Sequence, residues 1–173
     1  MSFENAAGLA ERFAGRFDDI RSKALKSITR SQATTFDSIY ELLTGVSSLF
    51  KTLAILESSV GSGTGSRKIC GNAVLVRSQD SVFFMRLNPL RAIAYNASQG
   101  LLRLSFGRIS VEVTDNAITV TLGRINQKIP YTDPADIANN ASAYRAVLSK
   151  ALPVTSELMT TVVSCAKAAG VRL

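Results

Sequence analysis

Histidine and tryptophan are missing from this chain of 173 residues, and cysteine occurs only twice. Without histidine, no Ser-His-Asp or Cys-His catalytic arrangement and no histidine-ligated zinc site can form. Two cysteines cannot supply a tetrahedral thiolate site. No phosphate-binding glycine loop, dinucleotide fingerprint or calcium-binding loop occurs. We therefore expect a protein that is not an enzyme, with no catalytic residues, no metal site, no cofactor and no small-molecule substrate.

The sequence also has little that is typical of an exported or membrane-spanning chain. Glu4 and Glu11 interrupt any apolar segment near the start, so we expect no signal peptide. The longest clearly apolar helical stretch, residues 42–56, is shorter than the roughly 20 residues that span a bilayer. Cys70 and Cys165 are predicted to be small buried apolar side chains, with a disulfide between them as an open alternative. We expect a cytoplasmic protein, or one inside an assembled particle, that is not secreted and has no transmembrane segment.

Acidic residues are fewer than basic ones, 13 against 20, which gives a formal net charge of +7. A surplus of this sign favours polyanionic partners, either nucleic acid or an anionic membrane surface, although it also serves solubility alone. The shares of hydrophobic and charged residues, 46% and 19%, are typical of a globular protein. The length fits one domain of ordinary size.

Residues 1–60 are predicted to form a helical arm with distinct apolar, basic and acidic faces. Apolar side chains recur at three- and four-residue spacing from Ala6 to Ile28, which indicates one helical stripe. A second stripe collects the basic side chains, which are candidates for phosphate binding. They are Arg12, Arg16, Lys23, Lys26 and Arg30. A solvated face with a few ion pairs is the alternative interpretation.

A second helix, predicted over residues 36–56, is apolar almost all round. Such a helix has to be buried, either in the core of the domain or against another copy of the protein. The candidate oligomerisation residues on it are Leu42, Leu43, Val46, Leu49, Phe50 and Leu53. Gly45 costs about 1 kcal/mol against alanine inside a helix, which indicates either a break or close helix packing there.

Residues 61–66 are rich in glycine and serine and are predicted to link the arm to residues 67–173, although the whole chain could be one domain. Alternating and continuous apolar runs after this linker predict strands. The predicted strands are 69–77, 81–87, 91–95, 101–106, 109–114, 117–122 and 125–130. Asp115 and Asn116 tolerate the left-handed conformation of a tight hairpin between two of these runs.

Two helices are predicted to follow the sheet. Asp133 is placed to cap the first of them, and Pro134 suits its first turn. We expect Pro153 to end this helix, because proline lacks the backbone N–H of a helix interior. A last helix then runs over residues 155–170. The predicted fold class is therefore α+β, with an N-terminal helical arm, an antiparallel β-meander of about six to seven strands and two C-terminal helices.

The order of the strands predicts where charges gather. In a meander of hairpins, every second turn lies at the same end of the sheet. Turns 88–90, 107–108 and 123–124 should therefore share one end, and Asp80 and Asp115 should lie at the other. The phosphate-binding candidates at the first end are Arg86, Arg91, Arg108 and Arg124. Arginine's planar fork suits phosphate, although arginine in turns also keeps loops solvated.

These features favour a basic binding protein that contacts phosphate backbones, most simply nucleic acid, in a sequence-tolerant way. The alternative is a self-assembling structural protein of the virion or matrix type, because the apolar helix and the hinge-like linker suit exchange between subunits. Both functions imply self-association or a polyanionic partner, and the two are compatible. A peripheral module on an anionic membrane surface is a third alternative.

Overall fold

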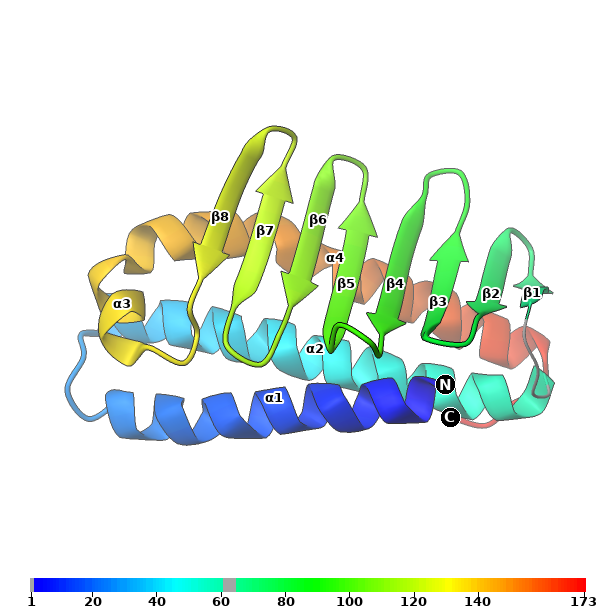
Figure 1. Cartoon of the computed structure of the whole chain (residues 1–173), viewed down its shortest axis with the longest axis horizontal. Helices are drawn as coiled ribbons and strands as arrows, with labels where there is room; N and C mark the ends of the chain where they lie inside the picture. The colour runs from blue at the N-terminus through cyan, green and yellow to red at the C-terminus, as the bar shows by residue number, and fades with distance from the viewer. Residues whose placement is uncertain (1, 61–64) are drawn as a thin grey trace.

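The computed structural model describes residues 2–60 and 65–173 and has the expected α+β class. Two long helices come first, α1 (Phe3–Ala24) and α2 (Arg30–Val60). An antiparallel sheet follows, and the chain ends with the short α3 (Pro134–Asn139) and the long α4 (Ala141–Ala168). Figure 1 shows the sheet standing against the layer of helices, with α4 behind it and α1 along its lower end. The predicted linker falls mostly on residues outside the described ranges.

The sheet is one meander in which each strand pairs with the next one along the chain. Its strands are β1 (Gly65–Cys70), β2 (Ala73–Arg77), β3 (Ser81–Arg86), β4 (Arg91–Asn96), β5 (Leu101–Phe106), β6 (Ile109–Val113), β7 (Ile118–Leu122) and β8 (Ile125–Ile129). The predicted count was too low, because the run 69–77 divides into β1 and β2. Gly71, whose φ is +49°, makes the turn between them. A left-handed position of this kind favours glycine. Because the turn lies inside one apolar run, the hydrophobic pattern alone predicts a single strand there.

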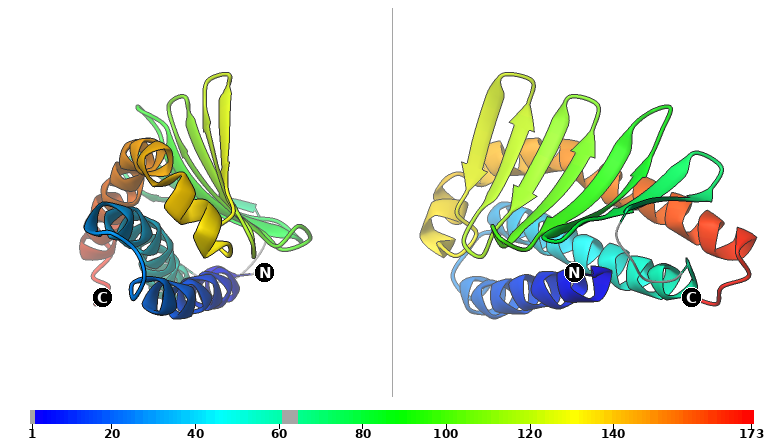
Figure 2. Two further views of the ribbon diagram at one scale, coloured as in Figure 1. Left: turned by 90° about the vertical axis from the view of Figure 1, so that its left-hand side faces the viewer. Right: turned by 45° about the vertical axis from the view of Figure 1, so that its right-hand side comes forward.

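One face of the sheet packs on the helices and carries the core. Leu75, Phe84, Ile93, Leu104, Val111 and Val120 are cross-strand neighbours in one row, and all are buried. The same hydrophobic cluster includes side chains of α1, α2 and α4. The predicted arm and the sheet therefore share a single core. Figure 2 shows the opposite face, which no other described element covers.

Helix α1 forms as the apolar stripe predicts, with Phe13 and Phe17 among its buried residues. The Ser2 hydroxyl accepts a hydrogen bond from the Asn5 N–H and caps the helix. The helix ends at Ala24, whereas the predicted stripes run further along the chain. Lys26 therefore lies in the turn, and Arg30 begins α2. The basic stripe along one helix was correct only up to Lys23.

Helix α2 lies at the centre of the protein. The candidate oligomerisation residues Leu42, Leu43, Val46, Leu49, Phe50 and Leu53 are 0–2% exposed. They pack in the core of their own chain, so the structure does not offer them to a second copy. The helix continues through Gly45, where an added Cβ would lie 3.2 Å from the Thr155 hydroxyl oxygen of α4. Gly45 therefore allows close packing of α2 against α4, and the alternative prediction of a helix break there was wrong.

Helix α2 is also longer than the apolar stretch that we delimited from sequence. By length and composition alone, residues 30–59 would suffice to cross a membrane. Half of its most apolar window is buried within the protein. Core helices of water-soluble proteins meet the same criterion of length and composition, so this property carries little weight.

Helix α4 runs through Pro153, so the prediction that this proline ends a helix was wrong. Pro153 is exposed, and the carbonyl that loses its hydrogen-bond donor can face water. Near the end of α4, Cys165 forms a disulfide with Cys70 of β1. The bond ties the edge strand β1 to the helix layer. Beyond β8, the edge strand on the opposite side of the sheet, Asp133 caps α3 as predicted.

Candidate phosphate-binding surfaces

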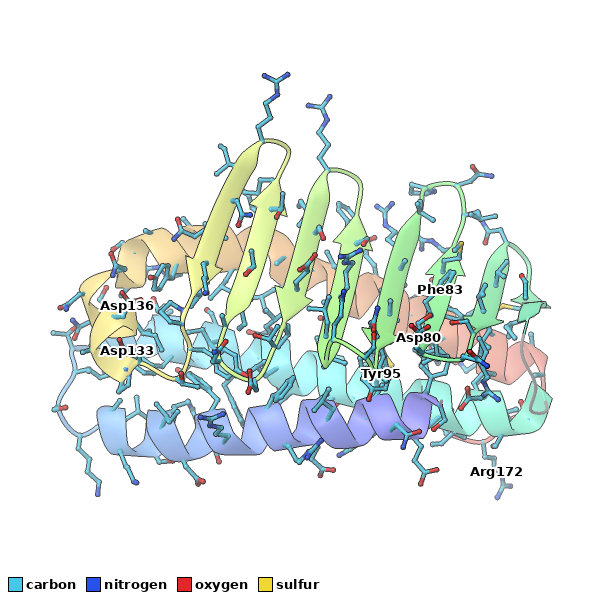
Figure 3. All side chains as sticks on the ribbon, viewed as in Figure 1. Asp80, Phe83, Tyr95, Asp133, Asp136 and Arg172 are labelled. Carbon is cyan, nitrogen blue, oxygen red and sulfur yellow. A yellow bond between two sulfur atoms is a disulfide. The ribbon has the colours of Figure 1, made fainter. Side chains whose placement is uncertain are left out.

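Four hairpin turns lie at the same end of the sheet, as the meander predicts. We call residues 71–72, 87–90, 107–108 and 123–124 the hairpin-tip edge. Figure 1 shows this edge projecting beyond α4, away from α1. The remaining turns, 78–80, 97–100 and 114–117, form the opposite end. Asp80 lies there, as Figure 3 shows, so the predicted division of the turns between the two ends is confirmed.

Arg108 and Arg124 occupy equivalent places in their two hairpins. Each follows a glycine with positive φ, Gly107 at +56° or Gly123 at +62°, and each is exposed. Within residues 2–60 and 65–173, neither guanidinium forms a hydrogen bond or an ion pair. The four turns of the edge contain no carboxylate. These two arginines are therefore open to an external anion.

Arg86 and Arg91 have a different environment, although they lie close to the same edge. They are cross-strand neighbours on β3 and β4, and both face α4. Arg91 pairs with the Glu157 carboxylate and stacks over the Phe106 ring, 3.8 Å from its centroid. Arg86 lies 3.8 Å from the same carboxylate. Both side chains therefore take part in a contact between the sheet and α4.

Glu157 was not predicted from the sequence as the partner of these arginines. A signal was present, because Glu157 is the only acidic residue between positions 141 and 168. A lone carboxylate on a helix that packs against arginine-bearing strands points to an ion pair. The sequence alone did not show that this helix crosses β3 and β4.

The hairpin-tip edge also carries exposed aliphatic side chains. Leu90 is 51% exposed and Ile125, next to Arg124, is 67% exposed. Leu87, at the start of the same turn as Leu90, is 40% exposed. The edge therefore combines isolated positive charges with aliphatic contact area, and it presents no exposed aromatic ring for base stacking.

The basic face of α1 lies at the other end of the strands. Arg16 donates a hydrogen bond from Nη1 to the backbone oxygen of Asp115 at 3.0 Å. Arg12 is one turn away on the same face. Strands of five to six residues separate this face from the hairpin-tip edge by about 17–20 Å. The structure does not join the two predicted groups into one surface.

The remaining basic candidates lie near the far end of α1. Lys23 borders a mostly apolar hollow of about 520 Å³ between α1 and α3, together with Ile28 and Pro134. Lys26 and Arg30 are exposed around the turn between α1 and α2. This end of the protein is chemically mixed, because Asp133 and Asp136 of the α3 region lie there too, as Figure 3 shows.

Two tyrosines of the described ranges have raised pKa values. Burial, with a hydrogen bond to Asp136, raises the pKa of Tyr144 to about 12. Burial likewise raises the pKa of Tyr131 well above its usual range. Both phenols are therefore neutral donors at physiological pH. Within residues 2–60 and 65–173, no three acidic or cysteine side chains are grouped so that they could hold a metal ion.

Comparison of this chain with protein-family models, with curated proteins and with solved structures finds no match.

Proposed function

We propose that the protein is a non-enzymatic binding protein that contacts the phosphates of a nucleic acid through its hairpin-tip edge. The observation that supports this most directly is the pair Arg108 and Arg124, exposed and unpaired within the described ranges, on an edge without carboxylates. Guanidinium groups bind phosphate oxygens in a bidentate manner and stay charged at any physiological pH.

The geometry of the edge favours contact with a backbone and not with bases. The turns that carry Arg108 and Arg124 are two strands apart, so their backbones are spaced by about 10 Å. Both side chains can therefore reach separate phosphates of one extended strand. Because phosphates carry no sequence information directly, binding should be tolerant of sequence and strongly dependent on salt.

The test is fluorescence anisotropy of a labelled single-stranded RNA of mixed sequence, titrated with protein across a salt series. We expect the double variant Arg108→Glu/Arg124→Glu to bind about tenfold more weakly at low salt. The slope of log affinity against log salt should fall by about 1.4, because each lost phosphate contact on single strands contributes about 0.7.

A matched control separates the edge from net charge. Lys128→Glu/Lys167→Glu makes the same change in formal charge at two exposed positions away from the edge. If both double variants lose the same affinity for RNA, the net charge of the protein explains the loss. That result would overturn the proposed role of the hairpin-tip edge. Binding to vesicles containing phosphatidylserine, without binding to RNA, would reassign the edge to a membrane surface, where Leu87, Leu90 and Ile125 supply apolar contact.

Self-assembly is a second candidate function, and the uncovered face of the sheet favours it. The half of this face on β2–β4 is apolar, with half-buried side chains that are cross-strand neighbours. They are Val74, Val76, Phe83, Met85, Ala92 and Ala94. The half on β5–β8 is polar and includes the Arg103–Glu112 pair. A two-fold dimer would bring the two apolar halves together, because a symmetric interface uses the same patch twice.

This candidate predicts a mass that depends on Phe83, whose position on β3 is labelled in Figure 3. We expect light scattering at high concentration to give a dimer for the parent protein and a monomer for Phe83→Lys. Thr119→Lys, on the polar half of the same face, should leave the dimer intact. A parent protein that stays monomeric at millimolar concentration contradicts the proposed interface.

A further inference from the structure

A cleft of about 490 Å³ lies between α1 and the opposite end of the sheet. Helix α1 contributes Arg12, Phe13 and Arg16 to its wall, and the turns after β4 and β6 contribute Gln99, Thr114 and Asp115. A hollow of this size is typical of sites for small organic ligands. Local sequence patterns did not indicate this cleft, because Arg16 and Asp115 on its two walls are 99 residues apart in the chain.

One of the two cations of the cleft is held in place before any ligand arrives, and the other is free to bind. Arg16 is anchored by its 3.0 Å hydrogen bond to the Asp115 carbonyl. The buried Tyr131 hydroxyl donates to the Thr114 carbonyl and fixes the same turn from inside. Arg12 is exposed, and no described residue forms a hydrogen bond or ion pair with it. Four residues apart on a helix, the two side chains begin about 5–6 Å from each other.

We propose that this cleft binds an organic phosphomonoester with a hydroxyl-bearing body, a nucleotide or a sugar phosphate. The guanidinium groups of Arg12 and Arg16 would hold the phosphate dianion. Asp115 is exposed at the rim, and its carboxylate accepts hydrogen bonds from ligand hydroxyls. Phe13, which is 5% exposed, gives the cleft an apolar wall against which the body of the ligand packs.

This inference does not depend on the proposed function, because the cleft and the hairpin-tip edge lie at opposite ends of the strands. A ligand in the cleft would contact α1 and two turns of the sheet at once. It would therefore stabilise the docking of α1 on the sheet, by an amount that grows with the logarithm of its concentration above the dissociation constant.

The test is isothermal titration of the full chain at low salt with three probes: uridine 5′-monophosphate, ribose 5-phosphate and inorganic phosphate. We expect both organic probes to bind, and inorganic phosphate to bind at least about tenfold more weakly. Tighter binding of the nucleotide than of ribose 5-phosphate identifies a nucleotide site. Equal binding of the two identifies a site for the sugar phosphate.

Variants assign the binding to the cleft. Arg12→Gln should weaken both organic probes about tenfold, whereas Lys23→Gln, on the same helix but outside the cleft, should leave them unchanged. Asp115→Asn should weaken the organic probes and not inorganic phosphate. The proposal is overturned if neither organic probe binds, if Arg12→Gln and Lys23→Gln behave alike, or if inorganic phosphate binds as tightly as the nucleotide. Circular dichroism of each variant confirms that the fold is intact.

Discussion

Replacing Glu57 by alanine should lower the free energy of unfolding by about 3–5 kcal/mol, the usual cost of breaking a buried ion pair. Glu57, near the end of α2, pairs with Arg77 of β2, and the two side chains are only 9% and 13% exposed. Its other oxygen accepts the backbone N–H of Phe3 at 3.2 Å. The substitution therefore leaves a buried guanidinium and a helix N–H without their partner. Equilibrium unfolding in urea measures the change.

Two further variants separate the buried charge from other effects. Glu57→Leu/Arg77→Met removes both charges and should restore most of the lost stability, because apolar pairs of similar volume replace buried ion pairs at little cost. Glu11→Ala breaks the Lys51–Glu11 pair, whose side chains are 53% and 65% exposed, and should cost less than about 1 kcal/mol. A loss for Glu57→Ala no larger than the loss for Glu11→Ala contradicts the importance of the buried pair.

Loss of the Cys70–Cys165 disulfide should lower the free energy of unfolding by about 2–4 kcal/mol. The two cysteines are 95 residues apart in the sequence, so the bond restricts a large loop of the unfolded chain. In the chain-entropy account, the stabilisation grows slowly with the length of that loop. The measurement is unfolding of Cys70→Ala/Cys165→Ala beside the parent protein, with and without a thiol reductant.

The reductant provides the control for this prediction. It should lower the stability of the parent protein to about that of the double alanine variant and leave the variant itself unchanged. An unreduced parent protein that exposes two reactive thiols on denaturation would contradict the bond.

Disulfides persist mainly in oxidising compartments. The bond therefore weighs against the cytoplasmic location predicted from the sequence.

The elements that sequence analysis predicted well are those defined by local patterns. The stripe with Phe13 and Phe17 predicted α1, and the tight turns at Gly107 and Gly123 predicted the hairpins. Alternation of apolar and polar side chains depends on neighbours along the strand, and the structure preserves it. The shared end of the turns followed from the order of the strands alone.

The features that could not be predicted from the sequence depend on contacts between distant residues. Arg91 was assigned to an external phosphate because Glu157, 66 positions away, could not be placed beside it. Pro153 was expected to end a helix, yet the packing of α4 along α2 and the sheet outweighs the loss of one hydrogen bond. The cleft at Arg12 was missed because Asp115 approaches α1 only in the folded chain.

The same dependence on distant contacts affects how the protein is made. Helix α4 leaves the ribosome after α1, α2 and the sheet, and it covers both α2 and the inner face of the sheet. Until it emerges, the buried faces of the preceding elements lack their cover, and exposed apolar surface of this kind promotes aggregation. The hairpins can form early, because each strand pairs with its neighbour. The nascent chain should therefore depend on chaperones until α4 has been synthesised.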